Sequence, residues 1–133
     1  MLVCFSLGCS ASLSSERDFQ LFWSKFKAAS LANDYSTLEK MIHFPLQVKG
    51  VVDDMPIESY SKNELRKIYP KLMMQTVSHY DGADKFIDMS FADLIKTIDK
   101  VNVGVDDKYI RVEQFEFDLI DGRWYLVSAY LEE

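Results

Sequence analysis

Cysteine is scarce in this 133-residue chain: the two cysteines, Cys4 and Cys9, both precede the first charged side chain, Glu16. With no cysteine after Cys9, the rest of the chain can form no internal disulfide, and cysteine usage leaves the redox compartment open. Long apolar runs are also missing, since none approaches the ~20 residues that a membrane-spanning helix needs. We therefore expect any link to a membrane to be a lipid anchor.

The chain has fewer basic than acidic side chains. The chain has 15 lysines and arginines against 21 acidic residues, which gives a net charge of -6 and a pI near 4.9. Such a molecule repels a nucleic-acid backbone on average, so we expect no nucleic-acid partner. The densest basic cluster surrounds Glu64 on a predicted helix, and we interpret it as a solvated helix face. Its members are Lys62, Arg66, Lys67 and Lys71.

Sequence motifs for metals, phosphates and nucleophiles are absent. The chain contains no HExxH, no CxxC, no calcium-binding loop, no GxSxG and no glycine-rich phosphate loop. We therefore expect no metal and no cofactor. The adjacent acids Asp53-Asp54 and Asp106-Asp107 are interpreted as turn residues with solvated carboxylates.

The chain has two histidines, and neither belongs to a recognised motif. His43 is expected at the end of a helix, where it would cap or pack. His79 is expected on a strand surface. A pair with Asp81 could do acid-base chemistry only if both faced a pocket.

The first 15 residues differ from the rest because they carry no charge. Within them, Ser6-Leu7-Gly8-Cys9 resembles a bacterial lipobox, which makes Cys9 the candidate for lipidation, although leucine is commoner at the position of Ser6. The segment lacks the basic start and the full apolar length of an export signal. We interpret residues 1–15 as a truncated signal or lipobox remnant whose start codon lies further upstream, and we predict a periplasmic or cell-envelope location. A frayed N-terminus of a cytoplasmic protein is the alternative.

Helical periodicity begins after this segment. Aromatic residues recur at helical spacing from Ser15 or Glu16 to about Leu31, and Asn33-Asp34 breaks the pattern. The buried stripe comprises Phe19, Phe22, Trp23, Phe26 and Ala29. Capping boxes predict two further helices, one starting at Ser36 and stopped by Pro45, the other starting at Ser61 and ended or kinked by Pro70. Ser90 predicts the cap of a fourth helix, whose inner face comprises Phe91, Leu94, Ile95 and Ile98.

Strand patterns fill the remaining chain. We predict strands at 46–50, at 55–59, where Pro56 indicates an edge strand, and at 76–80. The strands 108–120 and 123–131 flank Asp121-Gly122, a dipeptide typical of a two-residue hairpin turn. Apolar residues change parity within the first of these two strands, from Ile110 and Val112 to Phe115 and Phe117. We attribute that change to a bulge or bend that curves the sheet.

This order of elements resembles the nuclear transport factor two-like superfamily, also described as a cystatin-like cone. The resemblance covers nearly all of residues 18–133 and consists of patterns of residue type. Within the superfamily, the chain is similar to small exported bacterial members. The matching residues are Phe22, Phe26, Asp34, Leu38, Ile42, Phe44, Pro45, Leu46, Val48 and Trp124-Tyr125-Leu126-Val127. It implies one α+β domain over residues 16–133, in which a curved antiparallel sheet packs against N-terminal helices as a cone around a pocket. It implies no single activity.

Large side chains with polar tips suggest the lining of a ligand pocket or an interface. The candidate pocket residues are Trp23, Phe26, Tyr69, Phe115 and Tyr130. The preferred hypothesis is a non-enzymatic, exported binding or interaction domain for a small apolar ligand or a protein partner, with a homodimer left open. The alternative is a small isomerase, dehydratase or hydrolase-like enzyme that uses a buried carboxylate and a tyrosine, with Tyr109, Arg111 and Glu113 as candidates. A carboxyl of raised pKa beside a tyrosine hydroxyl would favour the enzyme, and a phenylalanine-filled interior would favour the binding domain.

Overall fold

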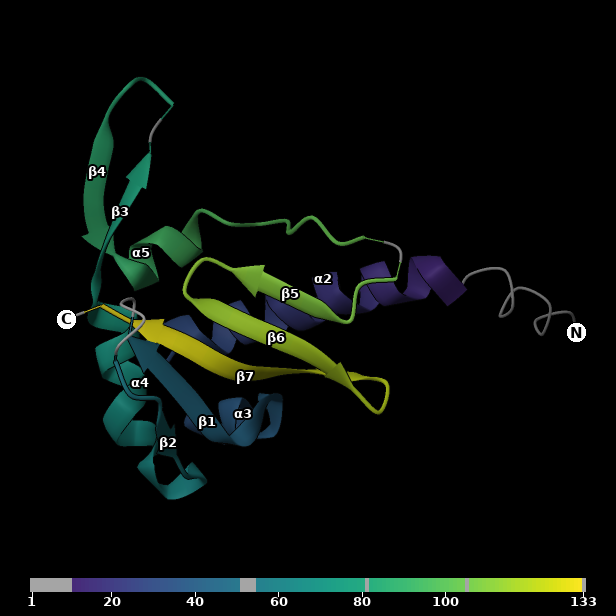
Figure 1. The fold of residues 1–133 in the computed structure, drawn as a ribbon. Coiled ribbons are helices and arrows are strands. Elements are labelled where there is room, and N and C mark those ends of the chain that lie inside the picture. The colour runs from purple at the N-terminus through teal and green to yellow at the C-terminus, as the bar shows by residue number, and fades with distance from the viewer. Residues whose placement is uncertain (1–10, 51–54, 81, 105, 133) are drawn as a thin grey trace, which may run out of the picture.

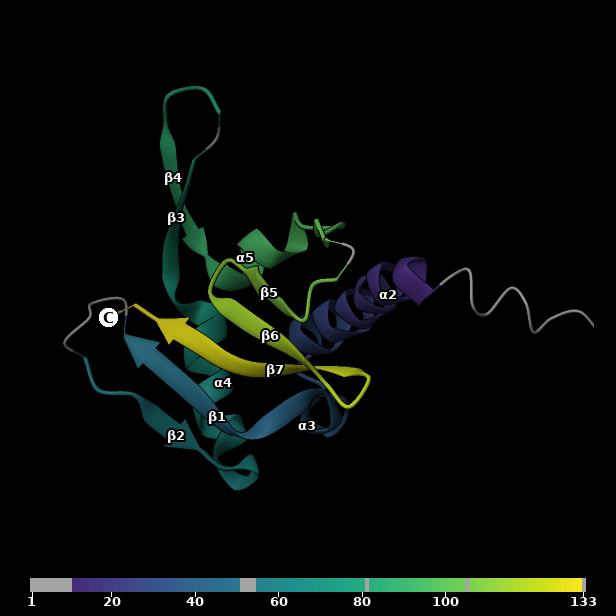
Figure 2. The ribbon, with the colours of Figure 1, turned by 45° about the vertical axis from the view of Figure 1, so that its right-hand side comes forward.

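The computed structural model describes residues 11–50, 55–80, 82–104 and 106–132. They form an α+β fold in which a curved five-stranded sheet carries helices on one face (Figures 1 and 2). The helices are α2 (Ala11–Leu31), α3 (Tyr35–Met41), the 3₁₀ turn η1 (Lys62–Glu64), α4 (Leu65–Met74) and α5 (Phe91–Lys96). The strands are β1 (Ile42–Gly50), β2 (Glu58–Tyr60), β3 (Thr76–Tyr80), β4 (Phe86–Ser90), β5 (Tyr109–Val112), β6 (Phe115–Ile120) and β7 (Arg123–Leu131).

The main sheet has the strand order β2-β1-β7-β6-β5, and it is mixed. The central strand β7 runs parallel to its neighbour β1, whereas all other neighbouring strands are antiparallel. The expectation of a wholly antiparallel sheet is therefore wrong. Strands β3 and β4 form a separate two-stranded hairpin that projects from the body (Figures 1 and 2).

Aromatic rings from α2 fill the space against the sheet. Phe19, Trp23 and Phe26 are fully buried, as the helical spacing predicts. The Phe26 ring meets the rings of Phe115 and Phe117 edge-on, with centroids 5.4 and 5.3 Å apart. Such edge-to-face contacts add to the free energy gained by burying the rings. The interior between helix and sheet is thus packed with phenylalanine.

The predicted strand 108–120 is in fact two strands. Glu113 and Gln114 form a tight turn between β5 and β6, with Glu113 at a φ of 54°, so Val112 pairs with Phe115 on one face. This hairpin explains the change of parity, and the bulge expected there is wrong. A register shift lies instead in the β6/β7 ladder, where Glu116 pairs with Ser128 but Phe117 pairs with Leu126.

Other local signals mostly match the structure. The Asp121-Gly122 turn is confirmed, with φ of 49° and 82°, and Ser90 Oγ accepts a hydrogen bond from the amide of Asp93. The Glu64 carboxylate accepts from the Ser61 amide at 2.9 Å, as the capping box predicts.

Several boundaries differ from the prediction. Asp34, not Ser36, caps α3, because its carboxylate accepts from both the amide and the hydroxyl of Thr37. Pro70 lies inside α4 and does not end it. Helix α2 starts at Ala11, before the expected Ser15, and β4 was not predicted. The lipobox residues up to Cys9, the pair Asp53-Asp54 and Asp81 lie outside the described residues.

Candidate functional site

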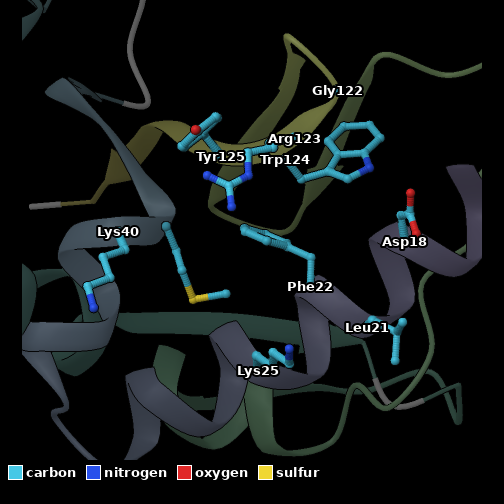
Figure 3. A pocket seen from close by; sticks show the side chains of 10 residues that line it. Asp18, Leu21, Phe22, Lys25, Lys40, Gly122, Arg123, Trp124 and Tyr125 are labelled. Carbon is cyan, nitrogen blue, oxygen red and sulfur yellow. The ribbon is translucent and has the colours of Figure 1, made fainter.

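A groove of about 480 Å³ lies where α2, the end of α3 and the start of β7 meet (Figure 3). Its lining comprises Asp18, Leu21, Phe22, Lys25, Lys40, Met41, Gly122, Arg123, Trp124 and Tyr125. The volume falls within the roughly 300–1,000 Å³ typical of small-molecule pockets. The groove is therefore large enough for a small organic molecule.

Helical spacing and a tight turn bring these residues together. Asp18, Leu21, Phe22 and Lys25 share one face of α2, because residues three, four and seven positions apart lie above one another. The Asp121-Gly122 turn reverses the chain, so that β7 begins beside that face. The resulting floor is apolar and aromatic.

Phe22 and Trp124 form the aromatic part of the floor. Phe22 is half-buried, and its ring packs edge-on against Phe117 with centroids 5.5 Å apart. The Trp124 indole is 5% exposed and meets Phe19 edge-on at 5.0 Å. Core contacts therefore hold both rings in place while one side of each faces the groove.

Among the described residues, the indole nitrogen of Trp124 is the only buried side-chain polar atom without a hydrogen-bond partner. Its nitrogen edge lies toward Asp18 in Figure 3. Leaving a buried donor unpaired costs about 1–3 kcal/mol. Trp124 thus holds an unpaired donor beside a ligand-sized space, and because the nitrogen is buried, an acceptor reaches it only when a neighbouring side chain shifts.

Three cations border the groove: Lys25, Lys40 and Arg123. Within the described ranges, none of their side chains forms an ion pair or a hydrogen bond. Asp18 is the one acid of the lining. The lining therefore has a formal charge of +2, from three cations and one carboxylate, on a chain whose net charge is -6.

The residues predicted to line a pocket lie elsewhere. Trp23, Phe26, Tyr69 and Phe115 are fully buried and leave no exposed surface to line a recess. Two of them also use their polar tips inside the core: the Trp23 Nε1 donates to the Ile98 carbonyl at 2.9 Å, and the Tyr69 hydroxyl lies 2.6 Å from Ser30 Oγ. Burial raises the pKa of Tyr69. These four side chains act as core.

Tyr130, the fifth predicted pocket residue, lies on the sheet face opposite the helices. Its ring packs under the Arg111 guanidinium, 4.3 Å from the centroid, and 5.4 Å from Lys49 Nζ. The structure therefore separates Tyr130 from the other four residues.

The candidate enzyme residues are only partly brought together. Tyr109 and Arg111 share the open face of β5, but Glu113 belongs to the turn, and its backbone carbonyl accepts a hydrogen bond from Arg111 Nε at 2.8 Å. The acid beside Tyr109 is Glu116 of β6, which the sequence reasoning missed. Tyr109 donates to Glu116 at 2.5 Å. Once residues 113–114 are recognised as a hairpin turn, Glu116 is expected directly opposite Arg111 on the neighbouring strand, on the same face as Tyr109.

Glu116 is 7% exposed and has three side-chain donors. Lys49 Nζ lies 2.8 Å from its Oε1, Ser128 Oγ donates to the same atom, and Tyr109 donates to Oε2. Burial raises the pKa of Glu116, but these three hydrogen bonds outweigh burial and lower the pKa to about 2. The pKa of Tyr109 rises to about 12, through desolvation and its bond to Glu116.

This cluster has the wrong chemistry for the enzyme hypothesis. That hypothesis requires a carboxyl whose pKa is raised toward neutrality so that it can transfer protons. Glu116 has a lowered pKa and stays ionised, and its donors occupy both oxygens. The cluster holds β1, β5, β6 and β7 together on the open face.

Neither histidine lies in the groove lining. His43 is an exposed residue of β1, because α3 has already ended at Met41, and its ring lies 6.0 Å from that of Tyr125. It packs there and does not cap a helix. His79 is half-buried on β3, opposite Ile87 of β4.

Among the described residues, no three His, Cys, Asp or Glu side chains are grouped to hold a metal ion, and no helix is long and apolar enough to cross a membrane. Compared with known proteins, the chain matches no family model, no curated protein and no solved structure. The resemblance to the nuclear transport factor two-like superfamily therefore stays a prediction.

Proposed function

We propose that this chain is a non-enzymatic binding domain whose groove between α2, α3 and β7 holds a small, largely apolar ligand. The observation that carries the proposal is the buried Trp124 indole, which borders a groove with an aromatic floor and has an unpartnered N–H. An apolar ligand would cover Phe22 and the exposed Leu21, and an acceptor on it would satisfy Trp124.

The proposal retains two expectations from the sequence. A cone-shaped, nuclear transport factor two-like fold would use a groove beside its long helix for binding, and the curved sheet with helices on one face supports that interpretation. The second expectation is that the protein is exported and carries a lipid on Cys9. Metabolic labelling with an alkyne fatty acid, followed by membrane fractionation, tests it: label and membrane association should disappear in Cys9→Ser, and an unlabelled native protein would overturn it.

The binding proposal can be tested with N-phenyl-1-naphthylamine, a neutral apolar probe whose fluorescence rises when it leaves water. Leu21→Glu places a charge on the groove wall without disturbing the core, because Leu21 is 56% exposed. Ile57→Glu is the matched control, since Ile57 is 59% exposed and does not line the groove. We expect Leu21→Glu to weaken probe binding about five-fold or more, from the loss of apolar contact, and Ile57→Glu to leave binding unchanged.

The two tryptophans provide an internal check on where the probe binds. In a ¹H–¹⁵N spectrum, the indole N–H signal of Trp124 should shift on addition of the probe. The signal of Trp23 should stay in place, because that N–H is bonded to Ile98 inside the core. Equal binding by the Leu21 and Ile57 variants, or an unmoved Trp124 signal at saturation, would overturn the proposal.

A further inference from the structure

We infer that the ligand of this groove is an amphipathic anion, with a carboxylate-like or sulfonate-like head at the α3 end and a ring or alkyl body over Phe22. The inference rests on the proposed function and adds to it the chemical class of the ligand.

Charge in the groove is separated along its length. Lys40 and the Arg123 guanidinium lie on the α3 side of Trp124, whereas Asp18 lies on the other side (Figure 3). Lys25 follows Phe22 by one helical turn and lies below its ring in the same view. An anionic head is therefore attracted to the Lys40 and Arg123 end, and Asp18 repels it from the opposite end.

These cations differ from lysines that are already neutralised elsewhere in the described chain. Lys27 pairs with Asp99 at 2.9 Å, Lys49 with Glu116 at 2.8 Å, and Lys96 with Asp93 at 3.4 Å. Around the groove, Lys25, Lys40 and Arg123 have no such partner. Arginine presents a planar fork of donors that matches a carboxylate or sulfonate, so Arg123 would recognise the shape of the head as well as its charge.

The size and surroundings of the groove limit the anion to a small one. A space of about 480 Å³ accommodates a molecule of a few rings or a short chain. The net charge of -6 on the whole chain opposes a polyanion that would extend beyond the groove. The apolar floor of Phe22, Met41 and Trp124 requires a body that gains by leaving water. Together these features describe an aromatic or aliphatic monoanion.

A matched pair of probes tests the inference. 8-Anilinonaphthalene-1-sulfonate has the ring system of N-phenyl-1-naphthylamine plus one sulfonate, so the two probes differ in the anionic head. The groove variant is Lys40→Gln/Arg123→Gln. The control is Lys71→Gln/Lys85→Gln, which removes the same charge at two exposed positions that do not line the groove.

We expect the groove variant to lose about ten-fold in affinity for the sulfonate probe, on the order of three-fold for each exposed cation, and less than two-fold for the neutral probe. The control should change neither affinity by more than two-fold. Raising the salt from 50 to 500 mM should weaken binding of the sulfonate probe alone.

The outcomes separate the inference from the function on which it rests. If the neutral probe binds and depends on Leu21, but the sulfonate probe is insensitive to Lys40 and Arg123, the groove binds apolar molecules and the anionic head is wrong. If the control lowers sulfonate affinity as much as the groove variant does, only overall charge matters, and the inference also fails. If neither probe depends on Leu21, the proposed function itself fails.

Discussion

Replacing Glu116 by glutamine should destabilise the protein in a strongly pH-dependent way. Glu116 is 7% exposed and accepts hydrogen bonds from Lys49, Ser128 and Tyr109. Its pKa falls from an ordinary 4.5 to about 2, which corresponds to about 3 kcal/mol of folding stability at pH 7. Glutamine keeps the shape but lacks the charge, and its amide group cannot accept from every donor. We expect Glu116→Gln to lower the free energy of unfolding by about 2–3 kcal/mol at pH 7.

The sign of the pH dependence follows from the lowered pKa. Ionised Glu116 contributes its full stability above pH 4.5, the pKa of the unfolded chain, and loses it as the pH falls toward the folded value of about 2. The difference between the wild-type protein and Glu116→Gln should therefore be constant from pH 7 to about pH 5.5. It should shrink to about 0–1 kcal/mol at pH 3, because roughly 2 kcal/mol has then been lost by linkage.

Urea unfolding followed by circular dichroism at pH 7, 5.5, 4 and 3 measures this difference. Other carboxylates titrate in both proteins, so subtracting the two curves isolates Glu116. Glu113→Gln is the matched control, because Glu113 is exposed in the turn and uses only its backbone carbonyl. It should change the stability by less than about 0.5 kcal/mol. A loss in Glu116→Gln that is the same at pH 7 and pH 3 would refute the reasoning, since packing and not charge would then be the cause.

Two further predictions concern the helices. Trp23→Ala should destabilise the fold by about 3–5 kcal/mol in urea unfolding, because the ring is fully buried and its Nε1 bonds the Ile98 carbonyl. A change below about 0.5 kcal/mol would show that the ring does not pack there. Asp34→Ala should lower the free energy of unfolding by loss of the α3 cap, and Ser36→Ala should lower it by less. The reverse order would place the cap at Ser36.

Local patterns predicted those parts of the fold in which neighbouring residues decide the structure. The aromatic stripe of α2, the Asp121-Gly122 turn and the Ser90 cap each depend on residues within one or two turns of chain. The second hairpin was missed because Glu113-Gln114 lacks the glycine or asparagine of a typical two-residue turn. The change of parity was nevertheless a signal of this turn. Two residues that face each other across a two-residue turn, such as Val112 and Phe115, are separated by an odd number of positions.

Local sequence patterns do not specify which distant strands pair with each other. Strand β1 pairs parallel to β7, so Val48 lies opposite Ala129, 81 positions later in the chain. No periodicity in either segment specifies its partner or its direction. The groove depends on the same kind of contact, because Phe22, Met41 and Arg123 meet only when α2, α3 and β7 have packed. Helical spacing alone places Asp18, Phe22 and Lys25 on one face, but it does not show what lies opposite.

On both faces of the main sheet, the candidate groups are already occupied by contacts within the protein. On the helix-covered face, Phe26, Phe115 and Phe117 fill the interior with no exposed surface. On the open face, the Glu116 carboxylate is paired with Lys49 and accepts a hydrogen bond from Tyr109. Of the described parts of the chain, the groove beside α2 combines what both faces lack: apolar surface that is still accessible, a buried donor without an acceptor, and cations that form no ion pair. A ligand that supplies an apolar body, an acceptor and one negative charge would complete all three.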